Sequence, residues 1–168
     1  MNTKELISIL KLHPCMQNCQ VHVCASNQLE YINITKKPIC IIVNSDIIDK
    51  PGSHWSSIYI DKFGEFQYCC SYGQAPTENS IFISNFFQLH CKTFLQNTRV
   101  IQSETSTICG GISVYFLIKR QQGLSMRNIL KHFRNDLNYN ERLIADFLCK
   151  QFGYCKFKRI FKIFSVIN

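Results

Sequence analysis

Three residues of this chain have the types and the order needed for acyl transfer through a thiol. His54 comes first, in the segment PGSHWSSIYID, and Gln102 and Cys109 follow in IQSETSTICGG. A cysteine attacks a carbonyl carbon as the thiolate, and both a helix N-terminus and a neighbouring imidazolium lower its pKa. Cys109 lies between a polar segment and a long apolar run, so the pattern places it at the start of a buried helix.

Each of these residues has both a chemical and an ordinary interpretation. His54 begins a predicted strand and could present its ring to a cysteine across a groove. Gln102 could donate an amide N–H to an oxyanion together with the backbone N–H of Cys109, and Gly110 and Gly111 would let a substrate backbone approach. The alternatives are a cysteine buried for packing, one of five ordinary histidines, and a solvated glutamine at a strand end.

The elements that would position these residues are helices at both ends of the chain and strands in the middle. A buried helix beginning at Cys109 should end at Gly123, and the tail KFKRIFKIF suits an edge strand or a surface helix. Clustered strands flanked by helices predict an α+β domain. Helices are predicted over 4–12, 80–91, 126–134 and 139–152, capped in three cases by Thr3, Ser125 and Asn138. Strands are predicted over 20–24, 38–44, 55–60, 65–70 and 99–102, and 73–79 is predicted to be a loop.

Composition limits the class of protein. The 168 residues suit one domain, 1–168, and 46% hydrophobic with 18% charged residues is typical of a globular chain. No apolar run reaches the ~20 residues that span a bilayer, and the N-terminus does not read as a secretory signal. The net charge of +8 favours nucleic acid or an acidic partner, although it also serves simple solubility.

Ten cysteines without a secretory signal indicate a reducing compartment inside the cell. Most of them should be small buried hydrophobes, with a few reactive thiols. The run HPCMQNCQVHVC offers zinc-ligand types at spacings near those of structural sites, but a strand through it would spread the side chains over both faces. We therefore predict no metal site from these five residues: His13, Cys15, Cys19, His22 and Cys24.

Taken together, three segments resemble the adenovirus-type cysteine endopeptidases, the adenain family, with relatives in adenovirus-like viruses and virus-like transposons. Residues 52–55, GSHW, match the family's Gly-Thr-His-Trp. Residues 71–73, SYG, match the second half of its Phe-Asp-Ser-Tyr-Gly segment. Gln102 lies seven residues before Cys109, which ends the run Ser-x-x-Cys ahead of a glycine. The resemblance covers roughly residues 20–120.

The resemblance implies a papain-related α+β fold with a central mixed β-sheet packed between helices. It also implies that Cys109 is the nucleophile, His54 the general base and acid, and Gln102 the oxyanion donor. Cys70 stands where the family has the aspartate or glutamate that orients the histidine. The chain thus departs from the family at the acidic member of the triad.

A thiol at position 70 is a poor hydrogen-bond acceptor and carries no charge unless it ionises. In a serine triad, loss of the carboxylate costs around 10⁴ in turnover, but a preformed thiolate–imidazolium pair depends on it less. The chain could therefore act as an impaired Cys–His dyad, or use Asp61, Glu65 or Asn44 in place of the acid. It could also be an inactive copy.

The resemblance further implies activation by DNA and by a viral peptide, without a required cofactor. Cys91, eleven residues before Gln102, falls in the region where the family's activating peptide bonds covalently. We expect a monomer, not bound to membranes, that cleaves viral or element-encoded capsid precursors during virion maturation, in the host nucleus or the virion. The alternatives are a deconjugase for ubiquitin-like proteins, since the wider superfamily shares this residue order, and an inactive DNA-associated virion protein.

Overall fold

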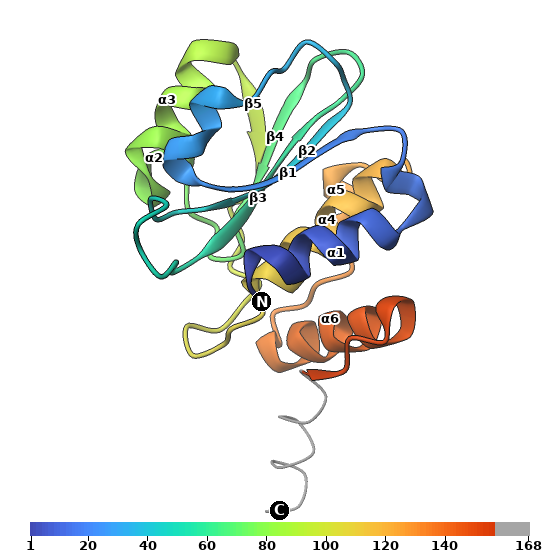
Figure 1. Ribbon diagram of the computed structural model, residues 1–168. Helices are drawn as coiled ribbons and strands as arrows, with labels where there is room; N and C mark the ends of the chain where they lie inside the picture. Colours follow the sequence, from blue (N-terminus) through green and yellow to red (C-terminus); the bar gives the residue numbers. More distant parts are fainter. Residues whose placement is uncertain (157–168) are drawn as a thin grey trace, which may run out of the picture.

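A mixed β-sheet of five strands runs through the middle of the molecule (Figure 1). The computed structural model describes residues 1–156. The strands lie in the order β1-β2-β3-β4-β5; β1 pairs with β2 and β4 with β5 in parallel, and the other two pairs are antiparallel. The predicted mixed sheet is thus confirmed. The strands are β1 (Gln20–Ala25), β2 (Ile39–Asn44), β3 (Trp55–Ile60), β4 (Phe66–Cys69) and β5 (Phe94–Gln96).

Helices cover both faces of this sheet (Figure 1). Successive side chains of β2 enter opposite cores: Cys40 and Ile42 belong to the core on the side of α4, while Ile41 and Val43 belong to the core on the side of α3. Burial on both faces explains why β2 reads as a continuous apolar run. The helices are α1 (Thr3–Leu12), α2 (Pro76–Asn79), α3 (Ile81–His90), α4 (Cys109–Gln121), α5 (Met126–Leu130) and α6 (Leu137–Phe152), with 3₁₀ turns at Pro14–Met16 and Ser26–Tyr31.

Helix α4 lies between the sheet and α6, and its first ten residues are all buried. A Cβ added to Gly111 would lie 2.8 Å from Ile144 Cγ2 and 2.9 Å from Leu148 Cδ1, both on α6. A Cβ added to Gly110 would lie 3.3 Å from Leu6 Cδ2 of α1. The two glycines therefore make room for neighbouring helices. That they also let a substrate backbone approach stays a prediction.

Two of the three predicted helix caps are displaced along the chain. The α1 cap is Asn2 rather than Thr3, and the α6 cap is Asp136 rather than Asn138. Both side chains accept a hydrogen bond from the backbone N–H three residues further on, as a capping residue does. Ser125 caps α5 as predicted.

The predicted strand over 99–102 is wrong; the edge strand is β5, a few residues earlier. Asn97 turns the chain after β5, because its Nδ2 donates to Cys70 O at 2.8 Å. The segment then makes one backbone hydrogen bond to the residues after β4, from Ile101 N to Ser71 O at 2.8 Å. A strand was expected here from apolar alternation alone, and the polar anchor at Asn97 overrides it. The segment 73–79, predicted as a loop, contains α2.

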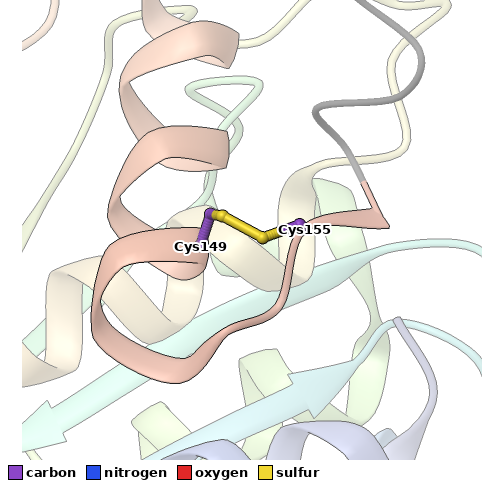
Figure 2. The surroundings of a disulfide bond; sticks show 2 residues. All are labelled: Cys149 and Cys155. Carbon is purple, nitrogen blue, oxygen red and sulfur yellow. A yellow bond between two sulfur atoms is a disulfide. The ribbon is translucent and has the colours of Figure 1, made fainter.

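A disulfide joins Cys149 of α6 to Cys155 just beyond that helix (Figure 2). Gly153 ends α6 with φ of 65°, and its N–H donates to Cys149 O, so the chain turns back toward the helix. The other eight cysteines are free thiols. The sequence predicted mostly buried thiols and a few reactive ones, and it did not predict this disulfide.

Two further predictions concern a membrane-spanning segment and the basic tail. Among residues 1–156, no helix is long and apolar enough to cross a bilayer. The alternatives for KFKRIFKIF concern a run that lies, after Lys156, outside the described residues.

Candidate active site

Cys109 is the first residue of α4, as the sequence pattern predicts, and its side chain is 8% exposed. At the N-terminus of α4, beside Cys109, the first backbone N–H groups have no acceptor within the helix. Burial raises the pKa of the Cys109 thiol, while the backbone N–H groups of Trp55 and Gly110 lower it. The thiol is thus buried beside donors that would stabilise it once it loses its proton.

His54 lies directly before β3 and is 7% exposed. Its Nε2 is 3.4 Å from Cys70 Sγ. Its Nδ1 is buried, and within residues 1–156 it has no hydrogen-bond partner. Burial lowers the pKa of His54 to about 4, so the imidazole is neutral at pH 7. A neutral imidazole with one free ring nitrogen is equipped to accept a proton.

The structure brings Cys109 and His54 into one site. Trp55, the residue after His54, places its backbone N–H at the Cys109 thiol, and its carbonyl accepts from Ser113 Oγ of α4 at 3.4 Å. The ring of Tyr72 stacks on His54, and a charge on Cys109 would raise the pKa of the same Tyr72. Cys109 is therefore in contact with the residue that follows His54, and it is close enough to act electrostatically on Tyr72, which stacks on His54.

Cys70 is fully buried at the end of β4 and contacts two nitrogen atoms. One is His54 Nε2 and the other is Asn79 Nδ2, which donates to the sulfur at 3.5 Å and to Ala75 O at 3.4 Å. An amide nitrogen can only donate, so the sulfur serves as an acceptor there. In the contact with His54, either the Cys70 thiol or the Nε2–H can donate, depending on the imidazole tautomer. A thiol is a weaker hydrogen-bond acceptor than the carboxylate that the adenain family has at this position.

The three residues expected to replace the acid do not occupy that position. The Asp61 carboxylate accepts from the N–H groups of Phe63 and Glu65, in the turn after β3, and His54 lies at the other end of that strand. Six residues of strand separate them, roughly 20 Å. Asn44 Oδ1 is held by two backbone N–H groups of the β2–β3 loop. Asp61 N donates to Glu65 O, so Glu65 also lies at the far end of β3, and none of the three replaces the acid.

Sequence reasoning missed one neighbour of His54, Tyr72, and one neighbour of Cys70, Asn79. Asn79 falls in a segment predicted to be a loop, and nothing in its sequence context marks it. Tyr72 was noted as part of the SYG match and given no role, although an aromatic residue beside a candidate acid position was a signal. The Tyr72 ring reaches His54, and the Asn79 amide reaches Cys70, only because α2 and the end of β4 fold together.

Gln102 is fully buried and held by three hydrogen bonds. Its Oε1 accepts from Ser71 Oγ at 2.7 Å, and its Nε2 donates to Ser106 O at 2.7 Å and to Tyr72 Oη at 3.5 Å. These contacts fix which end of the amide faces Tyr72. The bond to Tyr72 is long, so that N–H is the one able to change partner. The alternative of a solvated strand-end glutamine is wrong.

The remaining sequence candidates lie apart from this group. Cys91 ends α3, and its Sγ donates to Phe87 O at 3.3 Å. Burial raises the pKa of the Cys91 thiol, so it has no feature of an activated nucleophile. Near the N-terminus, Cys15 Sγ lies 3.0 Å from His13 Nδ1. In the part of the chain that the structure describes, no three His, Cys, Asp or Glu side chains are grouped to hold a metal ion.

No protein-family model matches the chain. A protein of Acanthamoeba polyphaga mimivirus, named as a thiol protease, is 31% identical over 135 residues, which cover 73% of this chain and 43% of that protein. The chain is similar to a viral thiol protease. It spans less than half of that relative's length.

Two solved structures are similar to the chain. ChlaDub1 from Chlamydia trachomatis matches with a TM-score of 0.53 and 14% identity, covering 92% of this chain and 76% of ChlaDub1. The ASFV protease matches with a TM-score of 0.40 and 19% identity, covering 61% of this chain and 41% of that protein. The first likeness shows that the chain and ChlaDub1 have a similar overall fold.

Proposed function

We propose that this chain is a cysteine endopeptidase of the adenain type, with Cys109 as nucleophile, His54 as general base and acid, and Gln102 as oxyanion donor. The observation that carries the proposal is the buried, unpartnered Nδ1 of His54 in the same site as the thiol at the start of α4. A buried polar atom without a partner is costly and calls for an explanation, and a proton-accepting role supplies one. The mimivirus relative's name supports the same activity.

The two pKa shifts determine when the proton moves. Burial raises the pKa of Cys109 and lowers that of His54. Both shifts favour a neutral thiol beside a neutral imidazole, against the expectation of a preformed ion pair. His54 Nδ1 would therefore take the thiol proton as the sulfur attacks the scissile carbonyl carbon.

The later steps use the same groups. The oxyanion would bind Gln102 Nε2 and the backbone N–H of Cys109. His54 would then give its proton to the leaving amine, which frees one product and leaves a thioester on Cys109. Water, losing a proton to His54, would attack the thioester, releasing the second product and the thiol. In each half-reaction His54 passes through a cationic form that Cys70 cannot stabilise by charge.

The substrates we propose are polypeptides, namely viral or element-encoded capsid precursors processed during virion maturation in the nucleus or the virion. The mimivirus relative supports a viral setting. The net charge of +8 supports an association with DNA through phosphate contacts, which would be salt-dependent. Cys91 is partly exposed and remains our proposed attachment point for an activating peptide on a monomeric enzyme.

Cleavage of fluorogenic peptides, measured with and without DNA, tests the proposed activity. Replacing Cys109 with alanine removes the attacking atom, so we expect cleavage to fall by more than about 10⁴-fold. Cys15→Ala removes another partly buried thiol near α4 and should leave turnover unchanged.

Equal cleavage by Cys109→Ala and the unchanged chain would contradict the proposal. Absence of cleavage from the unchanged chain, over a peptide set that includes capsid-precursor sequences and DNA, would favour the inactive virion protein instead. A modifier-based vinyl sulfone that labels Cys109 when no peptide is cleaved would favour the deconjugase.

A further inference from the structure

Tyr72 contacts two of the three groups that the proposed mechanism uses. Its ring stacks on the His54 imidazole, with centroids 4.6 Å apart and planes inclined by 28°. Its hydroxyl accepts a hydrogen bond from Gln102 Nε2 at 3.5 Å. Tyr72 is only two residues beyond Cys70, so one short segment after β4 touches both the histidine and the glutamine.

Hydrogen bonds place few other constraints on the His54 ring. Its Nε2 meets a thiol at 3.4 Å, and its Nδ1 has no partner within residues 1–156. A sulfur is a weak acceptor and holds an N–H less firmly than a carboxylate would. The hydrogen bonds at the ring edge therefore do little to prevent rotation of the imidazole about its side-chain bonds. The stacked phenol opposes it at the ring face, because rotation would break the offset stack.

The hydroxyl of Tyr72 has a separate effect on Gln102. One Nε2 proton is bound to Ser106 O at 2.7 Å, whereas the other reaches Tyr72 Oη only at 3.5 Å. An oxyanion is a charged acceptor and forms shorter and stronger bonds than a neutral hydroxyl. The second proton would therefore exchange the phenol for an oxyanion without any change at Ser106.

We propose that Tyr72 is a positioning residue, whose ring holds the His54 imidazole with Nδ1 toward Cys109 and whose hydroxyl holds Gln102 Nε2 until an oxyanion replaces it. This inference rests on the proposed endopeptidase function and assigns to an aromatic face part of the orienting role that an acid would have. Tyr72 itself reacts with nothing in this scheme.

Two substitutions separate the effects of the ring and of the hydroxyl. Tyr72→Phe keeps the stacked face and removes the hydroxyl, while Tyr72→Leu keeps apolar bulk and removes the aromatic face. Tyr31→Leu, at a tyrosine that is 79% exposed, is the matched control. Tyr72→Met provides a second non-aromatic variant if the leucine variant does not fold.

The readouts are kcat and KM, with nitrogen NMR of the imidazole rings for the tautomer and pKa of His54. For Tyr72→Leu we expect kcat to fall by about 10- to 10²-fold with KM almost unchanged, since a misplaced base slows only the chemical step. Its His54 should show mixed tautomers at pH 7. Tyr72→Phe should keep the unchanged chain's tautomer and stay within about threefold in kcat, because the ring remains.

The hydroxyl half of the proposal has its own readout. A peptide aldehyde, which forms a tetrahedral adduct with a thiol, should bind Tyr72→Phe at least as tightly as the unchanged chain. A Tyr72→Leu protein that keeps the original His54 tautomer and kcat would overturn the role of the ring. Tyr72→Phe binding the aldehyde about tenfold more weakly would overturn the role of the hydroxyl.

The NMR readout does not require turnover. If the unchanged chain cleaves nothing, the proposed function fails, while the tautomer of His54 in Tyr72→Leu still decides whether the ring positions the imidazole. The two failures are thus distinguishable.

Discussion

Replacing Cys70 with aspartate is expected to raise kcat/KM at neutral pH by about 10²-fold, part of the 10⁴ that a serine triad loses without its acid. The side chain would enter a position where two nitrogen donors already converge, His54 Nε2 at 3.4 Å and Asn79 Nδ2 at 3.5 Å from the sulfur. A carboxylate there accepts both bonds and stabilises the imidazolium that forms as Cys109 attacks.

The pH dependence should change in a defined direction. Burial lowers the pKa of His54 to about 4, so the unchanged chain should keep its base unprotonated, and its activity, down to about pH 4. A carboxylate beside Nε2 should raise this pKa by about 1–3 units. The acidic limb of kcat/KM in Cys70→Asp should therefore move to higher pH, while activity at pH 7 rises.

Cys70→Asn is the matched control, because its side chain has the shape of aspartate without the charge. It should gain less than about tenfold, since a neutral acceptor stabilises an imidazolium less than a carboxylate does. Thermal unfolding of both variants must be measured, because residue 70 is fully buried and an unpaired charge there would destabilise the fold. A folded Cys70→Asp protein with an unshifted acidic limb would show that position 70 does not act on His54.

Replacing Gln102 with alanine is expected to lower kcat by about 10²–10³-fold with little change in KM, as loss of an oxyanion donor does. One N–H of the Gln102 amide makes only a long bond, to Tyr72 Oη, and can turn to an oxyanion instead. Ser71 and Ser106 fix the orientation of the amide from its two ends. The backbone N–H of Cys109 would remain as the second donor, so some activity should persist.

Ser103→Ala provides the comparison for Gln102→Ala, because Ser103 lies in the same loop and bonds to Glu141 rather than to the site. It should change kcat by no more than about twofold, the size of a distant surface effect. If Gln102→Ala instead raised KM and left kcat within tenfold, the glutamine would act as a structural anchor for the 102–106 segment. Activity must be read below the melting temperature of each variant, since Gln102 is fully buried.

The sequence predicted those features that depend on local pattern. The helix beginning at Cys109 followed from a polar segment meeting an apolar run, and β2 from its continuous apolar stretch. The displaced caps at Asn2 and Asp136 are errors of one or two residues between similar capping side chains. These features need only neighbours along the chain.

The features that sequence reasoning missed depend on distant segments meeting. Residue 111 is a glycine because α6, about thirty residues further along the chain, packs directly against it. No local pattern distinguishes such a glycine from one that receives substrate. Asn79 meets Cys70 only because α2 folds over the end of β4. The bond between Cys149 and Cys155 likewise depends on how Gly153 turns the chain after α6. The candidate site was thus predictable in its members but not in what surrounds them.

The central claim is that Cys109 attacks substrate with His54 as its base. The most direct test is to treat the protein with a peptide vinyl sulfone and locate the adducts by mass spectrometry, in the unchanged chain and in His54→Gln. Burial alone predicts that the four partly exposed thiols, Cys15, Cys19, Cys24 and Cys91, react before Cys109, which is 8% exposed.

We predict the reverse order: one adduct, on Cys109, whose rate falls by at least about 10²-fold in His54→Gln because the general base is lost. Adducts spread over the more exposed thiols, or a rate at Cys109 that does not change in His54→Gln, would contradict the account.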